Sequence, residues 1–377
     1  MGMGGAYVGV CDDFTATQFN PAGLAQIRRI EIQTGLSHLF AHHEGAYYGT
    51  TKEDMTGYTR INTIGVVFPY PVYRGSLVFA AGYNRAISFD GSATFTGYNP
   101  VQVAKVDALE LENGGLGPIT LASAVDFLKD LSLGFSLDIW MGKDEYSWQV
   151  EKHILDSFGN VYIDSTLNDN ISTKFTGITL KFGCLYRMGS NLRVGAVISP
   201  PITLTAEETW NMSDEVRDVD TTVFSSWSGD YTYKIRRPFS FAAGLSLSFA
   251  FLLITADWSY TDWRQMKYTY PAEFLRKNPG FRDGYRATTR TRIGLEFPVP
   301  RTGLRLRGGY GVDPLAYQYH QIKKDRHYFS LGAGITFTGK VAVDLAFVRE
   351  EWEMATTGYI VEDIRHDKIF FTATFRI

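Results

Sequence analysis

The sequence has only two cysteines, no long apolar run and a small net charge. Cys11 and Cys184 are too few for a disulfide scaffold or a structural zinc site. No run of about 18 apolar residues is present, which excludes a transmembrane helix. The formal net charge of -3 implies no large basic surface, so we expect no nucleic-acid partner.

The first residues also lack a leader peptide. The chain opens Met1-Gly2-Met3-Gly4-Gly5, without the basic region and the apolar core of a secretory signal. If the protein is exported, we expect its signal peptide to be absent from this sequence.

No arrangement typical of an enzyme or a metal site is visible. A nucleophile elbow of the GxSxG type is absent, and most of the histidines are scattered. His38, His42, His43 and Glu44 lie close together, but they form no HExxH motif. We interpret them as part of a solvated loop, with a zinc site as the alternative. We therefore expect no enzymatic activity, no metal and no cofactor.

Aromatic residues and glycine are abundant. Phe, Trp and Tyr make up 15% of the chain, and there are 37 glycines, a composition that favours strands and tight turns. Positions 131–141 alternate between apolar residues and residues that are mostly polar or small, which is typical of a strand with one apolar face. The mean hydropathy of -0.12 is that of a soluble protein, but a transmembrane barrel gives the same average because its polar lumen offsets its apolar wall.

Fourteen segments show this alternation, and the connections between them are alternately short and long. In outer-membrane barrels the short turns lie at the periplasmic end and the long loops lie outside. An even strand count then places both termini at the periplasmic end. We predict an all-β fold, a 14-stranded antiparallel up-and-down transmembrane barrel, with strands near 30–40, 58–68, 75–89, 117–127, 131–145, 172–188, 192–206, 231–249, 252–266, 284–297, 304–314, 327–338, 341–353 and 365–377.

Two soluble folds are the alternatives. A propeller would show a repeat of about 40–50 residues, and none is apparent. A sandwich would not place seven long connections at one end, and several segments are long for sandwich strands. We predict loops at the long connections, which are 41–57, 90–116, 146–171, 207–230, 267–283, 315–326 and 354–364.

In a barrel that spans a bilayer, apolar side chains face the lipid and polar ones face the lumen. The hairpin around residue 250 fits this rule, since Leu245 and Phe249 alternate with Ser246 and Ser248. The last strand is similar to the signal that the barrel-insertion machinery reads, which makes that machinery an expected partner. That signal usually ends in Phe or Trp, whereas this chain ends in Ile377, so a few residues are expected to be missing.

Residues 1–29 do not alternate and are rich in Gly, Ala, Asp and Asn. The pattern GMGGAYVG, then DD, then NPAGLA resembles the amino-terminal hatch of the FadL/TodX/OmpP1 family, which are outer-membrane channels for long-chain fatty acids and hydrocarbons. The resemblance implies a hatch of residues 1–29 inside a barrel of residues 30–377, and an ordinary N-terminal arm is the alternative. Small residues would let the plug pack closely against the wall. The hatch motif consists of Gly4, Gly5, Asp12, Asp13, Asn20, Pro21, Ala22 and Gly23.

Within this motif, Asn20-Pro21 is typical of a turn or cap that reverses the chain. Asp12 and Asp13 are expected to bond backbone amides or arginines of the lumen.

Four arginines share the lumenal face of the predicted tenth and eleventh strands. They are Arg290, Arg292, Arg305 and Arg307. Inward-facing arginines usually have partners, so we favour a salt-bridge network that joins the wall to the hatch. The alternative is that one or two of them receive a ligand carboxylate in a bidentate contact.

The resemblance also implies a function, which is passive uptake of hydrophobic small molecules with lateral release into the outer membrane. In the family, release occurs at a kinked third strand. Here Gly82 and Asn84 lie in the predicted third strand, in an Ala-Gly-rich stretch where a bulge is plausible, and are the candidates for a lateral opening.

We expect a monomer in the bacterial outer membrane, surrounded by its lipid and lipopolysaccharide, with periplasmic termini. Two alternatives stay open at this stage. One is a secretion-associated barrel of the same superfamily, acting as a shuttle or scaffold for cargo proteins. The other is a structural barrel with no transport role. The identity of the hydrophobic ligand and the position of its pocket do not follow from the sequence.

Overall fold

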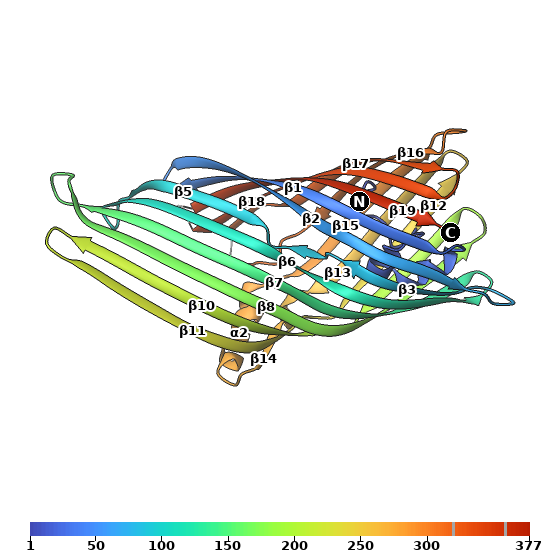
Figure 1. Ribbon diagram of the computed structural model, residues 1–377, viewed down its shortest axis with the longest axis horizontal. Coiled ribbons are helices and arrows are strands. Elements are labelled where there is room, and N and C mark those ends of the chain that lie inside the picture. Colours follow the sequence, from blue (N-terminus) through green and yellow to red (C-terminus); the bar gives the residue numbers. More distant parts are fainter. Residues whose placement is uncertain (319–320, 358–359) are drawn as a thin grey trace.

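The structure, a computed structural model, describes residues 1–318, 321–357 and 360–377. One antiparallel sheet closes on itself where β1 pairs with β19, which confirms the predicted 14-stranded barrel (Figure 1). The wall strands are β1 Glu31–Tyr47, β2 Thr50–Tyr70, β3 Leu77–Asn84, β6 Ala104–Leu128, β7 Leu131–Leu155, β8 Val161–Met188, β9 Leu192–Ser199, β12 Ser240–Phe249, β13 Leu252–Asp262, β15 Ala287–Pro298, β16 Leu304–Asp313, β17 Gln321–Phe337, β18 Val341–Thr357 and β19 Ile360–Arg376.

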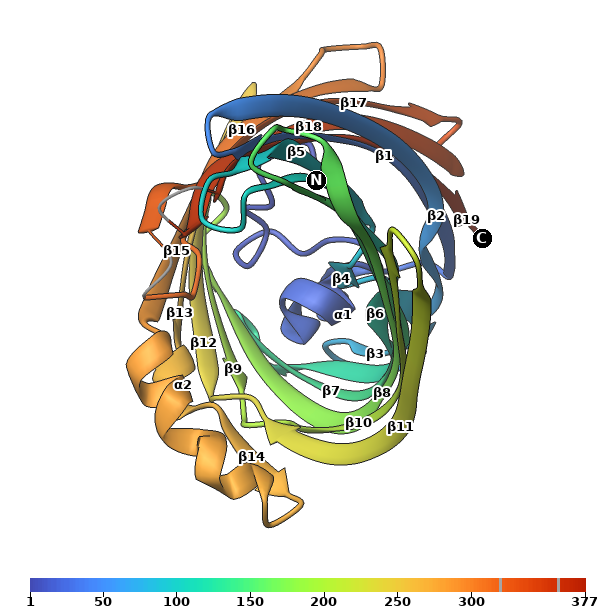
Figure 2. The same cartoon turned by 90° about the vertical axis from the view of Figure 1, so that its left-hand side faces the viewer.

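Five further strands and several helical turns complete the described secondary structure. The strands are β4 Ile87–Ser88, β5 Gly91–Asn99, β10 Thr203–Asp218, β11 Thr222–Arg236 and β14 Lys267–Tyr270. The helical elements are α1 Ala16–Phe19, η1 Pro21–Gln26, η2 Trp263–Gln265, η3 Phe274–Lys277 and α2 Asn278–Gly284. Figure 2 shows α1 inside the barrel, whereas α2 and β14 lie outside the wall. No helix in the described part of the chain is long and apolar enough to cross a membrane.

The short turns lie together at one end of the barrel, as predicted, and we call this the turn end (Figure 1). At the other end, three of the predicted loops are wrong. Residues 41–57, 146–171 and 207–230 are mostly long β-hairpins that extend the wall. β1 and β2, for example, join through Tyr48 and Gly49, whose positive φ angles of 46° and 84° match a two-residue hairpin turn.

The other long connections differ in part from the prediction. Residues 90–116 contain β5 and the first half of β6, and residues 267–283 contain β14, η3 and most of α2. The connections 315–326 and 354–364 lie partly outside the described residues, and their described parts include ends of β17, β18 and β19.

Two predicted strands are interrupted. The segment 192–206 breaks between β9 and β10 at Pro200-Pro201, and the segment 231–249 breaks between β11 and β12 at Pro238. Proline has no N–H to donate to a ladder, so a strand ends where proline falls inside a sheet. On the side of the breaks nearer the turn end, β9 pairs with β12. On the side away from the turn end, β10 pairs with β8 and β11.

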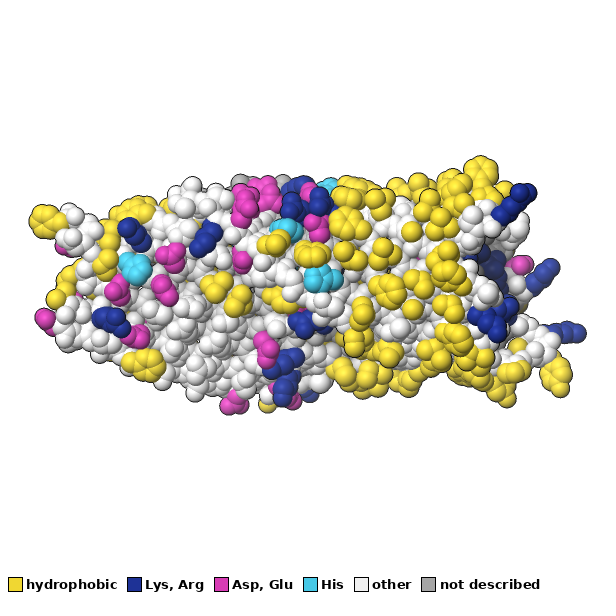
Figure 3. All heavy atoms as spheres, turned by 45° about the horizontal axis from the view of Figure 1, so that its top comes forward, with side chains coloured by type: hydrophobic (Ala, Val, Ile, Leu, Met, Phe, Trp, Pro, Cys, Tyr) yellow, Lys and Arg dark blue, Asp and Glu magenta, His cyan; other side chains and the backbone are white. Residues whose placement is uncertain are grey.

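The outer surface carries an apolar band next to the turn end (Figure 3). On β7 the outward side chains Leu133, Phe135 and Ile139 are exposed, while the alternating Ser132 and Ser136 are buried in the lumen. The same alternation holds on β12 and β13, so the predicted faces are confirmed. A closed barrel with an outward apolar face is suited to the hydrocarbon core of a membrane.

Residues 1–26 lie in the lumen (Figure 2), and we call them the lumenal segment. Apolar side chains of the segment form a buried cluster with the inner face of the wall. Phe14 and Leu24 are fully buried there against Val67 and Val78. The barrel core is thus built by the segment itself, because 14 strands enclose a lumen too wide for wall side chains alone to fill.

Candidate functional site

The lumen above the segment holds a chamber of about 890 Å³. Its floor is the lumenal segment, which contributes Gly5, Val8 and Phe19, and its sides come from strands all around the barrel. A cavity of this size matches sites that enclose small molecules (~300–1,000 Å³). Part of the wall is apolar, with Phe89, Trp140 and Ile202 packed in one cluster that lines the chamber.

The floor is held by hydrogen bonds from wall side chains to the backbone of the segment. The Asp257 carboxylate accepts from the backbone N–H groups of Tyr7 and Val8 at 2.6 and 2.8 Å. Lys181 donates to the carbonyls of Thr17 and Gln18 at 3.1 and 3.0 Å. Each bond replaces water on a backbone group that would otherwise be buried without a partner.

Asn20 joins the segment to itself and to the wall. Its amide nitrogen donates to the carbonyls of Val8 and Cys184, both at 3.0 Å, and its side-chain oxygen caps η1 by accepting from the Ala22 N–H at 3.1 Å. Pro21 occupies the first position of η1. The turn or cap expected at Asn20-Pro21 is therefore present.

The two hatch aspartates bond within the segment. Asp12 accepts from the Tyr7 hydroxyl at 2.6 Å, and Asp13 accepts from the Thr15 N–H at 2.8 Å. The sequence predicted backbone amides or lumenal arginines as partners, and Asp13 does bond a backbone amide. Both aspartates line a smaller cavity beneath the segment, together with Arg305.

A set of wall glycines, which the sequence analysis missed, seats the segment. A Cβ atom added at any of them would come within 3.0 Å of segment atoms. They are neighbours in pairs across the sheet. The glycines are Gly134 and Gly183, Gly195 and Gly244, and Gly294 and Gly309.

The small residues of the hatch motif meet this seat. Gly134 faces the backbone of Pro21 and Ala22, and Gly309 faces that of Gly4. Gly4 and Gly5 have positive φ angles of 61° and 67°, which glycine adopts without strain. Gly23 packs so closely on Cys11 that a side chain there would overlap it.

The four predicted arginines divide between the two sides of the segment. Arg290 and Arg292 line the chamber, whereas Arg305 and Arg307 line the cavity beneath the segment. Arg290 pairs with Asp313 at 2.6 Å, and Arg292 donates to the Gly5 carbonyl at 3.4 Å.

Beneath the segment, Arg307 pairs with Glu296 at 2.7 Å and with Asp344, and Arg305 lies 3.8 Å from Glu296. Each of the four arginines therefore has an acidic partner on the wall or a carbonyl partner on the segment.

A fifth arginine, also missed, lines the chamber at the break between β11 and β12. Arg237 makes no ion pair within the described residues, and its guanidinium carbon lies 5.5 Å from the ring centroid of Trp263. The Trp263 indole is fixed by donating to the Thr288 hydroxyl at 2.9 Å. An arginine over an aromatic ring retains donors that point elsewhere, so this group can receive an anionic or polar part of a guest.

The wall is interrupted above Asn84, where β3 ends. Beyond this point the chain continues as β4 and β5, which pair with β6, and the described residues Thr50 to Ile61 of β2 pair only with β1. The Tyr58 hydroxyl donates to the Gly91 carbonyl at 3.3 Å, and Ser92 donates to Thr56 at 3.3 Å. β5 thus covers the interruption from inside without completing the ladder.

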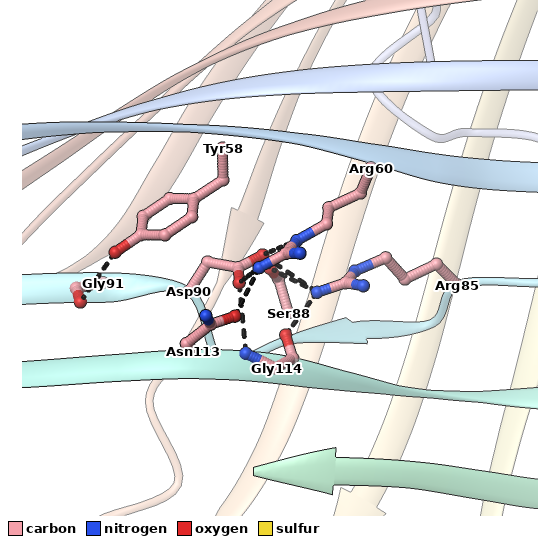
Figure 4. Close-up of polar contacts among 8 residues, drawn as sticks. All are labelled: Tyr58, Arg60, Arg85, Ser88, Asp90, Gly91, Asn113 and Gly114. Atoms are coloured by element: carbon pink, nitrogen blue, oxygen red, sulfur yellow. Dashed lines mark hydrogen bonds and ion pairs between the residues drawn. The ribbon is translucent and has the colours of Figure 1, made fainter. Parts of the chain in front are cut away.

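A buried carboxylate holds this interruption together (Figure 4). Asp90 accepts from Arg60 at 2.6 and 3.2 Å, from Arg85 at 2.9 Å and from the Gly114 N–H at 3.1 Å. Ser88 donates to it at 2.7 Å. These residues come from β2, from the chain between β3 and β5, and from β6, and we call them the Asp90 cluster.

The predicted opening residues lie at the foot of this interruption. Asn84 is buried, donates to the Thr17 hydroxyl at 3.1 Å and accepts from Thr63 at 2.8 Å. Gly82 faces the Phe14 ring, and an added Cβ would come within 2.5 Å of its Cζ atom. Both residues therefore belong to the third strand and also contact the lumenal segment that forms the floor of the chamber.

Above the apolar band, carboxylates of β6 face the chamber. Burial, together with Asp144, Glu110 and Asp90, raises the pKa of Glu112 to about 8. Glu112 is therefore mostly protonated at pH 7, which lowers the charge of the chamber wall. No group of three or more His, Cys, Asp or Glu side chains suited to a metal ion occurs in residues 1–318, 321–357 and 360–377.

A closed antiparallel barrel with an N-terminal segment in its lumen and a chamber above that segment defines the fold class of this protein. No protein-family model and no curated protein matches the sequence. Solved structures match over nearly the whole chain. The toluene transporter TodX of Pseudomonas putida is 15% identical with a TM-score of 0.64, and the alignment covers 100% of this chain and 96% of that one.

Two further structures match equally well. The toluene transporter TbuX of Ralstonia pickettii is 15% identical (TM-score 0.63, 99% and 97% covered), and a FadL homologue of Pseudomonas aeruginosa is 14% identical (TM-score 0.63, 99% and 96% covered). The chain has the FadL-type fold, as the resemblance of its first residues implied.

Proposed function

We propose that this protein is an outer-membrane channel of the FadL type for passive uptake of hydrophobic small molecules, long-chain fatty acids or hydrocarbons. The observation that carries the proposal is the chamber with a partly apolar wall, which lies in the lumen directly above the lumenal segment. Two neighbours of the same fold, TbuX and TodX, are toluene transporters, which supports this substrate class. Such molecules cross the polar outer layer of the membrane poorly, so a lumenal route removes that barrier.

Entry is supported by an aromatic array outside the chamber. Rings contact one another in succession from β11 through β14 and α2 to the chain after β16, with centroid distances of 5.1 to 6.3 Å. The array consists of Tyr231, Tyr233, Phe274, Tyr268, Phe281, Tyr285 and Tyr317. We call the open end of the chamber, away from the turn end, the mouth. A partly exposed aromatic surface beside the mouth binds apolar guests by burying their surface.

Three further aromatic residues lie on the β10–β11 hairpin. Phe224 and Trp227 are exposed and suit capture, whereas Trp210 packs against Gly229 with its indole nitrogen buried.

Exit is supported by the interruption above Asn84. A guest in the chamber meets the Asp90 cluster and β5 rather than a complete wall, since Arg60, Arg85 and Asp90 all line the chamber. Displacing β5 would open a path between β2 and β6. The lumenal segment closes the route straight through the barrel, so we propose sideways release into the bilayer.

Chamber filling tests the proposal. Ala242 on β12 lines the chamber, whereas its neighbour Ala243 pairs with the outward-facing Trp258. Ala242→Trp should abolish uptake of labelled fatty acid and toluene by cells that lack other channels of this type, and Ala243→Trp should leave it unchanged. Equal uptake by both folded variants would contradict the proposal. Cargo protein co-purifying in place of lipid would instead favour the shuttle alternative.

A further inference from the structure

The turn end of the barrel carries charge almost entirely of one sign. Its turns are residues 71–76, 129–130, 189–191, 250–251, 299–303 and 338–340, and the link from the lumenal segment to β1 is residues 27–30. Asp130 is the single acid of these stretches. The cations, which we call the basic rim, are Arg28, Arg29, Arg74, Lys129, Arg301 and Lys340.

The rim charges are available to a partner. All six side chains are exposed. Among the described residues, Arg28 alone of the six forms an ion pair, with Asp126 at 3.4 Å, and its side chain remains 60% exposed. Arg29 donates to the Gly339 carbonyl at 3.2 Å, which leaves its charge uncompensated.

The rim lies at the edge of the apolar band. Figure 3 shows basic side chains gathered at this end of the molecule, directly beyond the hydrophobic ones. Tyr73, fully exposed, precedes Arg74, and the exposed Phe127 and Leu128 precede Lys129. Exposed apolar and aromatic side chains beside cations are typical of the depth at which lipid headgroups lie.

The spread of the rim argues for a lipid rather than a single protein partner. The cations occupy turns from β15–β16 through β17–β18 and the start of β1 to β2–β3 and β6–β7, a wide arc of the circumference. The tight turns at the other end, residues 48–49, 100–103, 156–160 and 219–221, contain no cation. Many equivalent headgroups can occupy such an arc at once.

We propose that the basic rim binds the phosphate groups of anionic phospholipids in the adjoining leaflet. The proposal rests on the membrane placement of the proposed function, but it concerns the bilayer and not the transported molecule. Guanidinium and ammonium groups near an anionic surface are attracted to it, and the attraction is screened by salt. The rim would then fix the depth of the barrel at this leaflet.

The test uses the full chain in nanodiscs with equal amounts of phosphatidylglycerol and phosphatidylcholine, and native mass spectrometry of the retained lipids. We expect the unmodified chain to retain phosphatidylglycerol severalfold over phosphatidylcholine. The rim variant should show a ratio near one, and high salt should reduce the ratio of the unmodified chain. The rim variant combines Arg29→Gln, Arg74→Gln, Arg301→Gln and Lys340→Gln.

A matched control removes four exposed cations at the mouth, and it should keep the preference. It combines Lys267→Gln, Arg276→Gln, Lys277→Gln and Arg282→Gln. Resistance of each unheated variant to unfolding in dodecyl sulfate shows that the barrel has formed. A rim variant with unchanged preference, or an unmodified chain with none, would overturn the proposal. No transported ligand is present, so this outcome is independent of the uptake measured for Ala242→Trp.

Discussion

A single methyl group is decisive at the glycine seat of the lumenal segment. The paired wall glycines approach the segment backbone more closely than any residue with a Cβ allows. Protein interiors are close-packed and resist overpacking, so an added methyl group must move either the wall or the segment. The wall is held by ladder hydrogen bonds on both sides, whereas the segment is held mainly by scattered side-chain contacts. We therefore expect the segment to move.

Gly309→Ala should loosen the seal of the lumen. An added Cβ at Gly309 meets the Gly4 backbone, whereas an added Cβ at the neighbouring Gly308 would lie 3.9 Å from its nearest contact, the Ser330 carbonyl. Vesicles containing Gly309→Ala should become permeable to small polar solutes in a swelling assay, while those containing Gly308→Ala should stay tight. If both variants remain equally tight, the glycine seat does not control the seal.

Arg237 is the residue that we expect to distinguish ionic from neutral guests. Its charge faces the chamber without an acidic partner in the described chain, whereas Arg290 is already paired with Asp313. Arg237→Gln should weaken binding of a long-chain fatty acid about tenfold, since a charge-assisted hydrogen bond is lost (~1.4 kcal/mol), and should leave toluene binding unchanged.

Titration calorimetry or fluorescence quenching in detergent would measure both ligands. Arg305→Glu serves as the comparison, because Arg305 lies beneath the segment and should not affect the chamber. A similar loss for both ligands in Arg237→Gln would mean that the residue shapes the chamber and does not read the carboxylate.

At the scale of elements, the interruption of the third strand is held by few interactions. β5 is attached to β2 through side chains, in addition to the Asp90 cluster, and has no ladder with it. Segments that depend on such contacts move more readily than ladder strands. This makes β5 the element that we expect to gate sideways release.

A disulfide between Thr56→Cys and Ser92→Cys, in a Cys184→Ser background, should lock β5 onto β2. The hydroxyl oxygens of the native residues lie 3.3 Å apart. Uptake should fall severalfold after oxidation and recover on reduction. The control is a disulfide between Ser147→Cys and Asn170→Cys, which are paired positions on β7 and β8. Its oxidation should have no effect on uptake. Full uptake by the locked barrel would exclude an exit that needs movement of β5.

The elements that the sequence predicted are those with one face toward lipid. There, alternation of the kind seen from Leu133 to Ile139 reports the burial of every second side chain, and the strand count followed from it. Beyond the apolar band, the outer face of the wall strands is exposed to solvent, and often the inner face is exposed as well. Residues 50–57 of β2, for example, are all exposed or half-exposed, so no apolar alternation marks them and they were assigned to a loop.

The missed site residues have a related cause. A lone glycine in a strand carries little information until pairing brings Gly195 beside Gly244 and Gly294 beside Gly309. Arg237 was hidden because the predicted strand 231–249 ran through the break at Pro238, which carries this side chain to the chamber wall. Prolines inside a predicted strand were the signal available in the sequence.

As a whole, the molecule is strongly asymmetric along its axis. β7 has 25 residues and β8 has 28, although about ten residues of a tilted strand suffice to cross the hydrocarbon core. The surplus lies entirely on the side away from the turn end, since the apolar band adjoins that end (Figure 3). Mouth, chamber, floor and turn end therefore follow one another along a single direction. Uptake requires the mouth to face the outside of the cell.

This orientation can be tested directly with single cysteines. Ser157 is exposed at the tip of the β7–β8 hairpin, and Ser190 is exposed in the β8–β9 turn at the opposite end. In intact cells, a membrane-impermeant maleimide too large to pass the outer membrane should label Ser157→Cys and not Ser190→Cys, whereas lysed cells should show both. The native Cys11 is buried, and Cys184 is replaced by serine to avoid background. Labelling of Ser190→Cys in intact cells would show that the turn end faces outward. The aromatic array and the chamber would then open toward the periplasm, which is incompatible with uptake.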